Sequence, residues 1–249
     1  MTNGKIKKKA PQKSKKGDKK ANKGFGAFIN EIKNDVKSVR ERDPAAKSNA
    51  QVLLLSPGIH ALVAYRIAHK MYDKKHYFGA NLISHIARRR TGIEIHPGAK
   101  IGRGLVIDHG MGVVIGETAE VGDNCTIYQG VTLGGTGKDV GKRHPTLGNN
   151  VLVGAGAKVL GPLKIGDNVK IAANAVVLKE IPDNCTAAGI PARIVRRAGR
   201  KVDDLDQINI PDLVAQEIKR LEEKISALQT ELEEIKSKKP SKKTEKAKE

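Results

Sequence analysis

Three histidines in the middle of the chain, His96, His109 and His144, carry the side chains best suited to proton transfer near neutral pH. His109 directly follows Asp108 and is surrounded by glycines, so we expect it to lie in a bend and not in a packed interior. A neutral imidazole in such a place can take the proton of a hydroxyl group. The sequence therefore predicts that His109 is a general base, with a structural surface histidine as the alternative.

A zinc site is a second interpretation of the same histidines. Zinc at a subunit boundary would use all three imidazoles. The intervals of 13 and 35 residues between them do not place two ligands on nearby turns of one face. We therefore expect no metal.

Charged neighbours support acid–base chemistry. Glu94 lies fifteen residues before His109, close to one turn of the repeat described below, and is predicted to approach His109 from the neighbouring turn. A carboxylate in that position fixes the tautomer of the imidazole. Arg143 and His144 stand side by side, and Arg143 is predicted to bind a carboxylate through two parallel hydrogen bonds.

The elements that must position these residues show a period of six. Aliphatic residues occupy positions 95, 101, 107, 115, 121, 127, 133, 147, 153, 159, 165, 171 and 177. Gly often follows the aliphatic residue, and the residue two before it is usually small or apolar, as expected for a flat strand and a turn. The pattern predicts a mainly β domain, a left-handed parallel β-helix of hexapeptide repeats, in which three strands close each triangular turn.

The repeat is interrupted twice. Near Gly112 to Ile115 its phase slips by two residues, and between Leu133 and Leu147 the spacing is fourteen residues. The second interruption is a Gly-rich, charged loop. We expect it to carry function, with a tolerated surface insertion as the alternative.

Helical patterns flank the repeats. Apolar residues at spacings of three and four begin at Phe25 and stop at Asp43-Pro44, and further helices are expected from about Pro57 to Lys75 and about Phe78 to Arg90. After the repeats, a heptad seam comprises Val214, Ile218, Leu221, Ile225, Leu228, Leu232 and Ile235. This seam is expected to zip with copies of itself or to fold back on the coil. Our hypothesis is a parallel three-helix zipper, although Ile and Leu do not by themselves exclude a dimer.

The charge of the chain is concentrated at its ends. Of the net charge of +19, residues 1–23 carry +9 and residues 236–249 carry +5. Such Lys-rich tails are predicted to be disordered solubilising arms, with attachment to an anionic surface or RNA as the alternative. A nucleic-acid partner is not expected, because neither aromatic residues nor arginines interleave the lysines.

The predicted division of the chain is a disordered Lys-rich tail at 1–23, a short helical domain at 24–92, a β-helix catalytic domain at 93–197 with a loop at 134–146, a linker at 198–210, a coiled-coil helix at 211–236 and a disordered Lys-rich tail at 237–249. The stretch from Val52 to Ala68 is interrupted by polar residues, so no membrane span is expected. No secretory signal is recognised, and Cys125 and Cys185 fit a reducing compartment, so a cytoplasmic protein is expected.

From about residue 28 to 197 the chain resembles the serine O-acetyltransferases, hexapeptide-repeat enzymes that acetylate L-serine on the way to cysteine. The resemblance is carried by Ile95-His96-Pro97, Ile101-Gly102-Arg103-Gly104, Asp108-His109, Gly116-Glu117-Thr118, the run QGVTLGGTGK at 129–138, Arg143-His144-Pro145, Gly154-Ala155-Gly156-Ala157-Lys158 and Gly189-Ile190-Pro191-Ala192-Arg193. The helical stretches 39–45 and 60–66 are similar as well. The run at 129–138 with Arg143-His144-Pro145 downstream is more specific than the repeat alone.

The resemblance implies a role for each candidate residue. His109 would be the general base on the serine hydroxyl, oriented by Glu94, where some members carry Asp. Asp43 and Asp108 would hold the serine ammonium group, and Arg143 with His144 its carboxylate. His109, Glu94 and His144 are then the expected catalytic residues.

The resemblance also implies the ligands. Acetyl-CoA would be the co-substrate and would lie along the outside of the coil between two subunits, near Gly135, Thr136, Ala155 and Lys170. No bound cofactor or metal is needed, because the thioester supplies the activated acyl group. Cysteine shares the amino-acid moiety of serine and is expected to inhibit at the same site.

A homotrimer is expected, because the helical domain is shorter than the one that joins two trimers in many members of the family. Members that dock into O-acetylserine sulfhydrylase usually end in Ile, whereas this chain ends in Lys-Ala-Lys-Glu, so that complex is not expected. Two alternatives stay open: a hexapeptide acyltransferase for a sugar, antibiotic or other amine, and a non-enzymatic trimeric scaffold.

Overall fold

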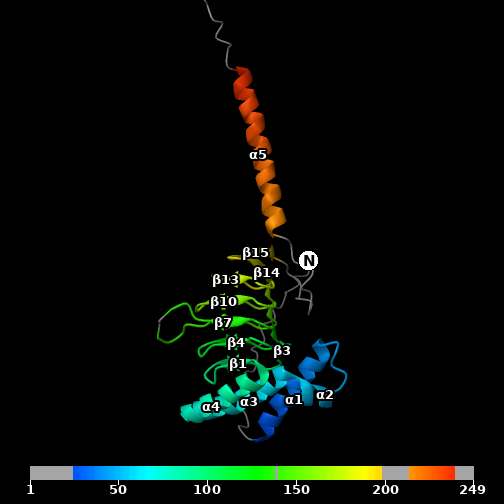
Figure 1. Ribbon diagram of the computed structural model, residues 1–249, viewed down its shortest axis with the longest axis vertical. Coiled ribbons are helices and arrows are strands. Elements are labelled where there is room, and N and C mark those ends of the chain that lie inside the picture. Colours follow the sequence, from blue (N-terminus) through cyan, green and yellow to red (C-terminus); the bar gives the residue numbers. More distant parts are fainter. Residues whose placement is uncertain (1–24, 138–139, 198–212, 239–249) are drawn as a thin grey trace, which may run out of the picture.

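The computed structural model describes residues 25–137, 140–197 and 213–238. Outside the described residues lie the predicted tail at 1–23, the predicted linker at 198–210 and Lys138 of the family motif. The predicted tail at 237–249 lies outside them as well, except that residues 237–238 end the last helix. These described residues form four helices, a stack of short strands and a final helix (Figure 1).

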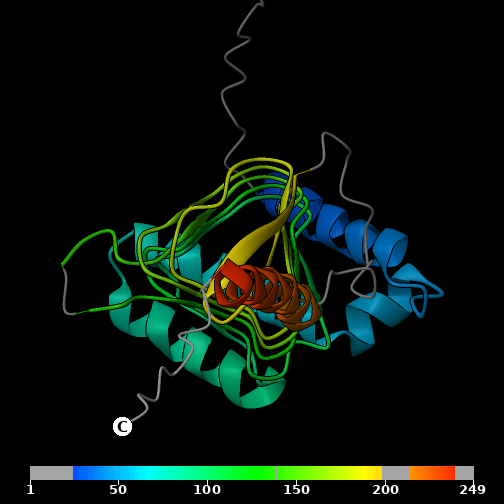
Figure 2. The same ribbon diagram turned by 90° about the horizontal axis from the view of Figure 1, so that it is seen from above.

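The strands build a parallel β-solenoid with three faces, and Figure 2 shows its triangular cross-section. Face A contains β1 (Glu94–Ile95), β4 (Val114–Ile115), β7 (Thr132–Gly134), β10 (Lys158–Leu160) and β13 (Val176–Val177). Face B contains β2 (Lys100–Ile101), β5 (Glu120–Val121), β8 (Thr146–Leu147) and β11 (Lys164–Ile165). Face C contains β3 (Val106–Asp108), β6 (Thr126–Tyr128), β9 (Leu152–Val153), β12 (Lys170–Ile171) and β14 (Cys185–Gly189), and β15 (Ala192–Arg197) pairs antiparallel with β14. The predicted mainly β, repeat-built fold is confirmed.

The repeating aliphatic residues form the core. Ile115, Leu133 and Val159 are stacked along face A in register and are fully buried. Equivalent residues of the other two faces meet them inside the coil, so each turn buries its aliphatic side chains only by stacking on its neighbours. The core thus explains why the period of six is kept over the whole solenoid.

The corner between faces B and C is held by a ladder of asparagines. Asn124, Asn150, Asn168 and Asn184 all adopt left-handed backbone conformations, which Asn tolerates better than most residues. The Asn150 side-chain amide donates to Asn168 at 3.2 Å, and that of Asn168 donates to Asn184 at 3.1 Å. This ladder fixes the spacing of successive turns at that corner.

The helices pack at the end of the coil where the chain enters it (Figure 1). They are α1 (Phe25–Arg42), α2 (Asn49–Leu55), α3 (Pro57–Asp73) and α4 (Tyr77–Thr91). A buried ion pair links α3 to α1, with Arg66 Nε donating to Asp35 at 2.7 Å, and the Asp35 carboxylate also accepts from the Gly104 amide at 3.2 Å. The α1 helix is therefore fixed to the coil.

The fifth helix, α5 (Leu213–Lys238), extends past the opposite end of the coil (Figure 1). Within the described residues, no single helix is long and apolar enough to cross a membrane; only α2 and α3 taken together, which are bent by 72° at their junction, reach that length and composition.

Candidate active site

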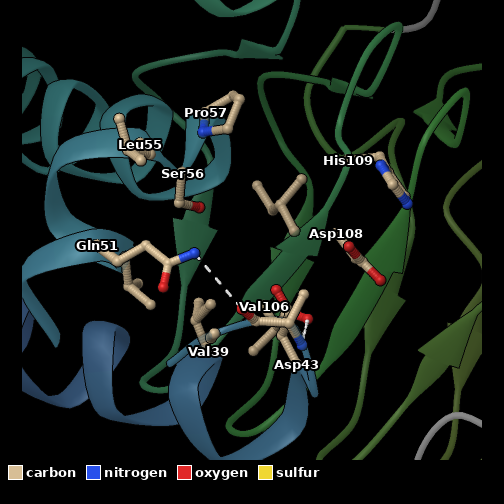
Figure 3. Close-up of a pocket in the computed structure, with 13 residues that line it drawn as sticks. Val39, Asp43, Gln51, Leu55, Ser56, Pro57, Val106, Asp108 and His109 are labelled. Atoms are coloured by element: carbon tan, nitrogen blue, oxygen red, sulfur yellow. Dashed lines mark hydrogen bonds between the residues drawn. The ribbon is translucent and has the colours of Figure 1, made fainter. Parts of the chain in front are cut away.

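Three of the predicted site residues, Asp43, Asp108 and His109, line one cavity of about 370 Å³. We call them the His109 group. Figure 3 shows their side chains, with Ser56 and Pro57 at the start of α3 also lining the cavity. Two carboxylates and an imidazole beside one cavity suit binding of a cationic group and proton transfer.

A two-residue bulge places His109. The interval from Ile107 to Ile115 is eight residues, whereas the stacked interval from Ile127 to Leu133 is six. His109 has a left-handed backbone with φ of 56°, and the following Gly110 has φ of 78°. The bulge turns the imidazole of His109 out to an exposed position at the corner between faces C and A. The phase slip in the sequence is thus the feature that exposes the predicted base.

Arg42 fixes the position of Asp43. At the end of α1, the Arg42 guanidinium donates to Thr126 Oγ1 at 3.0 Å, to the carbonyls of Asn124 and Cys125, and to the carbonyl of Gly104. Asp43 follows directly, and its carboxylate accepts the Ala45 amide at 2.8 Å. The helix end is thereby attached to the coil, and Asp43 faces the same cavity as Asp108.

Glu94 occupies the first strand of face A, next to the bulge. The Gly112 amide donates to the Gly92 carbonyl at 2.8 Å, so the backbone before Glu94 contacts the His109 turn. The Glu94 carboxylate pairs with Arg88 at 3.0 Å, and within the described part of the chain no hydrogen bond joins it to His109. The predicted dyad is therefore close in backbone position but not formed in this structure.

Arg143 and His144 lie at another corner, between faces A and B, with Glu117 and Thr118 beside them. We call these four residues the Arg143 group. The loop after β7 returns there and brings His144 against the turn that follows β4. His144 Nδ1 lies 2.9 Å from Thr118 Oγ1 and accepts the Thr118 amide at 3.2 Å. Burial lowers the pKa of His144, and the Arg143 charge lowers it further, so both effects favour the neutral ring.

Glu117 orients Arg143. Its carboxylate accepts the Arg143 guanidinium at 2.5 Å and the Tyr72 hydroxyl of α3 at 2.9 Å. The bond from Arg143, followed by that from Tyr72, lowers the pKa of Glu117, whereas the same Glu117 contact raises the pKa of Tyr72. Arg143 thus has a defined direction and a partly exposed cation that can meet an anionic ligand.

The residues expected to bind acetyl-CoA are divided in the same way. Gly135 and Thr136 are exposed and follow β7 at the corner between faces A and B. Ala155 lies in the turn between β9 and β10, at the corner between faces C and A, and Lys170 begins β12 on face C. Within one chain, the structure therefore does not bring Gly135 and Thr136 together with Ala155 and Lys170.

The His109 group and the Arg143 group occupy different corners of one coil. Figure 2 shows α1 and α2 beside one part of the triangle and the loop after β7 projecting from another. Asp43, Asp108 and His109 meet, and Arg143 meets His144, but the two groups do not form one cavity within a chain. The same separation removes His109 from the other two histidines of the zinc interpretation. Among the described residues, no three His, Cys, Asp or Glu side chains are placed to hold a metal ion.

Tyr72, Glu117 and Thr118 are site residues that the sequence analysis did not assign. Glu117 and Thr118 belong to the quoted Gly116-Glu117-Thr118 motif, and a charged residue followed by a hydroxyl in a tight turn is the signal that could have identified them. Tyr72 gives no signal in the sequence, because it reaches Glu117 from a helix 45 residues away.

Comparison with known proteins places the chain in context. Residues 144–179 match the family model "Bacterial transferase hexapeptide (six repeats)". The serine acetyltransferase of Synechococcus elongatus is 57% identical over 199 residues, covering 80% of this chain and 82% of that relative. The serine acetyltransferase of Bacillus subtilis is 53% identical over 210 residues, covering 84% of this chain and 97% of that relative.

Solved structures of similar fold are serine acetyltransferases as well. A serine acetyltransferase in complex with cysteine superposes with a TM-score of 0.72 and 42% identity, covering 75% of this chain and 73% of the other. A serine acetyltransferase in complex with CoA has a TM-score of 0.66 and 42% identity over 69% of this chain and 71% of the other. The soybean enzyme complexed with serine has a TM-score of 0.66 and 43% identity over 68% of this chain and 69% of the other.

Proposed function

The chain belongs to the serine acetyltransferase family, and from that premise we propose how its residues transfer the acetyl group of acetyl-CoA to the hydroxyl of L-serine. The observation that carries the assignment of roles is the division of the site into two chemically different groups. The His109 group offers two carboxylates and a base, and the Arg143 group offers a cation and a neutral imidazole. L-Serine carries the complementary ammonium, hydroxyl and carboxylate groups.

In the proposed reaction, Asp43 and Asp108 hold the serine ammonium group, and Arg143 with His144 holds its carboxylate. His109 accepts the hydroxyl proton as the serine oxygen attacks the thioester carbonyl carbon. The carbon–sulfur bond then breaks, and the CoA sulfur leaves with the proton carried by His109. The products are O-acetyl-L-serine and free CoA, which makes this the first step of cysteine synthesis.

Glu94 is proposed to orient the His109 imidazole when substrate is bound. Its longer side chain compensates for the Asp of some family members, and its strand adjoins the His109 turn. Formation of the dyad requires the Glu94 carboxylate to exchange its exposed ion pair with Arg88, which costs little because both groups remain accessible to water.

The complete site is proposed to form between neighbouring copies in a homotrimer. Rotation about a threefold axis brings the C–A corner of one coil beside the A–B corner of the next, which is a closed heterologous arrangement. The same contact unites the two pairs of residues proposed to bind acetyl-CoA, Gly135 with Thr136 and Ala155 with Lys170. Cysteine is proposed to inhibit by taking the place of serine, since a solved relative is described as a complex with cysteine.

The enzyme is proposed to work in the cytoplasm, which is supported by Cys125 and Cys185 being buried free thiols. No complex with O-acetylserine sulfhydrylase is proposed.

The test is release of free CoA thiol from acetyl-CoA in the presence of L-serine, beside His109→Ala and a panel of sugars and other amino acids. We expect serine-dependent release that falls at least a hundredfold in the variant, in the range expected for loss of a general base. Release with another acceptor alone would assign the protein to the alternative acyltransferase reaction. If protein of the expected mass releases no CoA with any acceptor, the non-enzymatic trimeric scaffold would be the remaining interpretation.

A further inference from the structure

The helix α5 carries an apolar stripe that the rest of the described chain leaves uncovered. Every described side chain from residue 218 to 235 is exposed. The stripe consists of Ile218, Leu221, Ile225, Leu228, Leu232 and Ile235, each 49–64% exposed. Six large aliphatic side chains on one face of a single helix are typical of an interface that is completed by another chain.

The spacing of the stripe defines its partner. The intervals between successive members are three, four, three, four and three residues, so Ile218 takes heptad position a and Leu221 takes position d. This period of 3.5 residues follows the seam of a left-handed coiled coil. A second copy of the same helix has the same period and therefore fits the stripe along its whole length.

Flanking charges do not decide the pairing. In a parallel arrangement, Glu231 at position g stands opposite Lys236 at position e of the next helix, whereas Glu217 stands opposite Glu222. One attractive and one repulsive pair offset each other. The apolar seam must therefore supply the stability.

We propose that three copies of α5 associate as a parallel three-stranded coiled coil. Each stripe is then covered by the α5 helices of two further copies of this chain. The proposal rests on the proposed trimer, whose rotation axis brings the three carboxyl-terminal ends of the coils to the same side. Fifteen residues, 198–212, precede the helix, and a chain of that length reaches at most roughly 50 Å, enough for three helices to meet at a common axis.

The seam residues are compatible with three strands and do not impose them. Ile at a with Leu at d in the first two heptads favours two strands, whereas Leu232 at a with Ile235 at d favours three or four. The coil, whose divided site needs neighbours at two corners of each chain, therefore sets the number of copies. The zipper then keeps the site between chains intact at low protein concentration.

The first experiment dilutes the full chain from 10 µM to 1 nM and measures mass by mass photometry and serine-dependent CoA release. The variant Leu221→Glu/Leu228→Glu alters the seam. The matched control Ala227→Glu/Thr230→Glu adds the same charge at outward positions of the same helix. On dilution, we expect the seam variant to dissociate and to lose specific activity at a protein concentration at least tenfold higher than the one at which the wild type and the control do so. At 10 µM the seam variant should regain activity. Equal dilution profiles for the two variants would overturn the proposal.

The second experiment places single cysteines in α5 and oxidises the native protein with oxidised glutathione, so that it does not depend on destabilising variants. In a parallel, in-register seam, Leu228→Cys joins equivalent positions of two copies, whereas Ala227→Cys does not. The native thiols, Cys125 and Cys185, are buried. Cross-linked dimers from Ala227→Cys to the same extent would contradict the proposed register. A trimer without serine acetylation would overturn the proposed function while leaving the zipper supported.

Discussion

Thr118 Oγ1 and His144 Nδ1 lie 2.9 Å apart, and their contact fixes the tautomer of the imidazole. Thr118 Oγ1 already accepts the backbone amides of Arg143 at 3.0 Å and His144 at 3.1 Å, so its own proton is directed to Nδ1. The Thr118 amide also donates to Nδ1 at 3.2 Å. Nδ1 is therefore an acceptor, and the proton of the neutral ring resides on Nε2. His144 thus carries an N–H donor at Nε2, the group that its proposed role in binding the serine carboxylate requires.

The variant Thr118→Val tests this relationship, because valine keeps the shape of threonine and removes its hydroxyl. The backbone amides of Arg143 and His144 lose their acceptor, and Nδ1 loses one of its two donors, since the backbone amide of residue 118 remains. We expect kcat/KM for serine to fall about tenfold or more, since about 1.4 kcal/mol of lost transition-state stabilisation corresponds to a factor of ten. Thr118→Ser retains the hydroxyl and should stay within about threefold of wild type. Equal kinetics for the valine and serine variants would contradict the role of the hydroxyl.

Gly116 makes room for the same ring. A Cβ atom at Gly116 would lie 2.1 Å from His144 Nε2, which is closer than real atoms approach. Gly116→Ala should therefore displace His144 and reduce kcat/KM for serine by about a hundredfold, comparable to loss of a positioned catalytic group. Gly26→Ala is the control, because a Cβ atom in that exposed position of α1 meets no atom within 4 Å. Wild-type kinetics in Gly116→Ala would show that His144 does not need this position.

Glu117 offers a separate test of how Arg143 is oriented. Glu117→Gln removes the ion pair at 2.5 Å but keeps a side chain of the same size. Because Arg143 is proposed to bind the serine carboxylate, we expect KM for serine to rise about tenfold, the effect of about 1.4 kcal/mol, with KM for acetyl-CoA unchanged. Tyr72→Phe removes only the second hydrogen bond of Glu117 and should have a smaller effect in the same direction. A variant with altered kcat and unaltered KM for serine would contradict a positioning role.

Much of the fold follows from the period of six, because a stacked coil repeats its buried residue at each face. The seven-residue helix α2 was not predicted, since Asn49–Leu55 is too short to show helical periodicity. It begins at Ser48, whose side chain accepts the Gln51 amide at 3.1 Å. This N-cap, and not an apolar repeat, is the feature of the sequence that indicates the start of α2.

The composition of the site could be predicted only in part. His109 is marked by the phase slip, but the approach of Asp43 depends on Arg42 binding carbonyls more than 60 residues away. Thr118 and His144 are separated by 26 residues, because the loop after β7 lengthens that turn of the coil. Contacts between a repeat and an inserted loop have no fixed spacing in the sequence, so they require the folded structure.

Acid should weaken the coil through Asp123. The Arg103 amide, followed by the Arg103 side chain, stabilises the charged form and lowers the pKa of Asp123. A carboxylate with a lowered folded-state pKa contributes stability that is present above its unfolded pKa of about 3.9 and is lost as pH falls through the folded value. Asp123→Asn should therefore lower the urea midpoint at pH 7, and this difference should shrink below pH of about 3.9. A difference independent of pH would exclude the carboxylate as its source.

Mixed assemblies test whether the two halves of the site come from different chains. His109→Ala and Arg143→Ala should each be nearly inactive alone. If each site takes His109 from one chain and Arg143 from its neighbour, random co-assembly leaves about one quarter of the sites with both halves intact. Co-expression with two affinity tags, followed by purification through both, yields mixed trimers whose mass is checked by light scattering. Since both tags select against pure assemblies, serine-dependent CoA release should reach at least about a quarter of the wild-type value per site. Verified mixed trimers without recovered activity would show that each chain holds a complete site by itself, because a site confined to one chain carries one of the two substitutions in every copy.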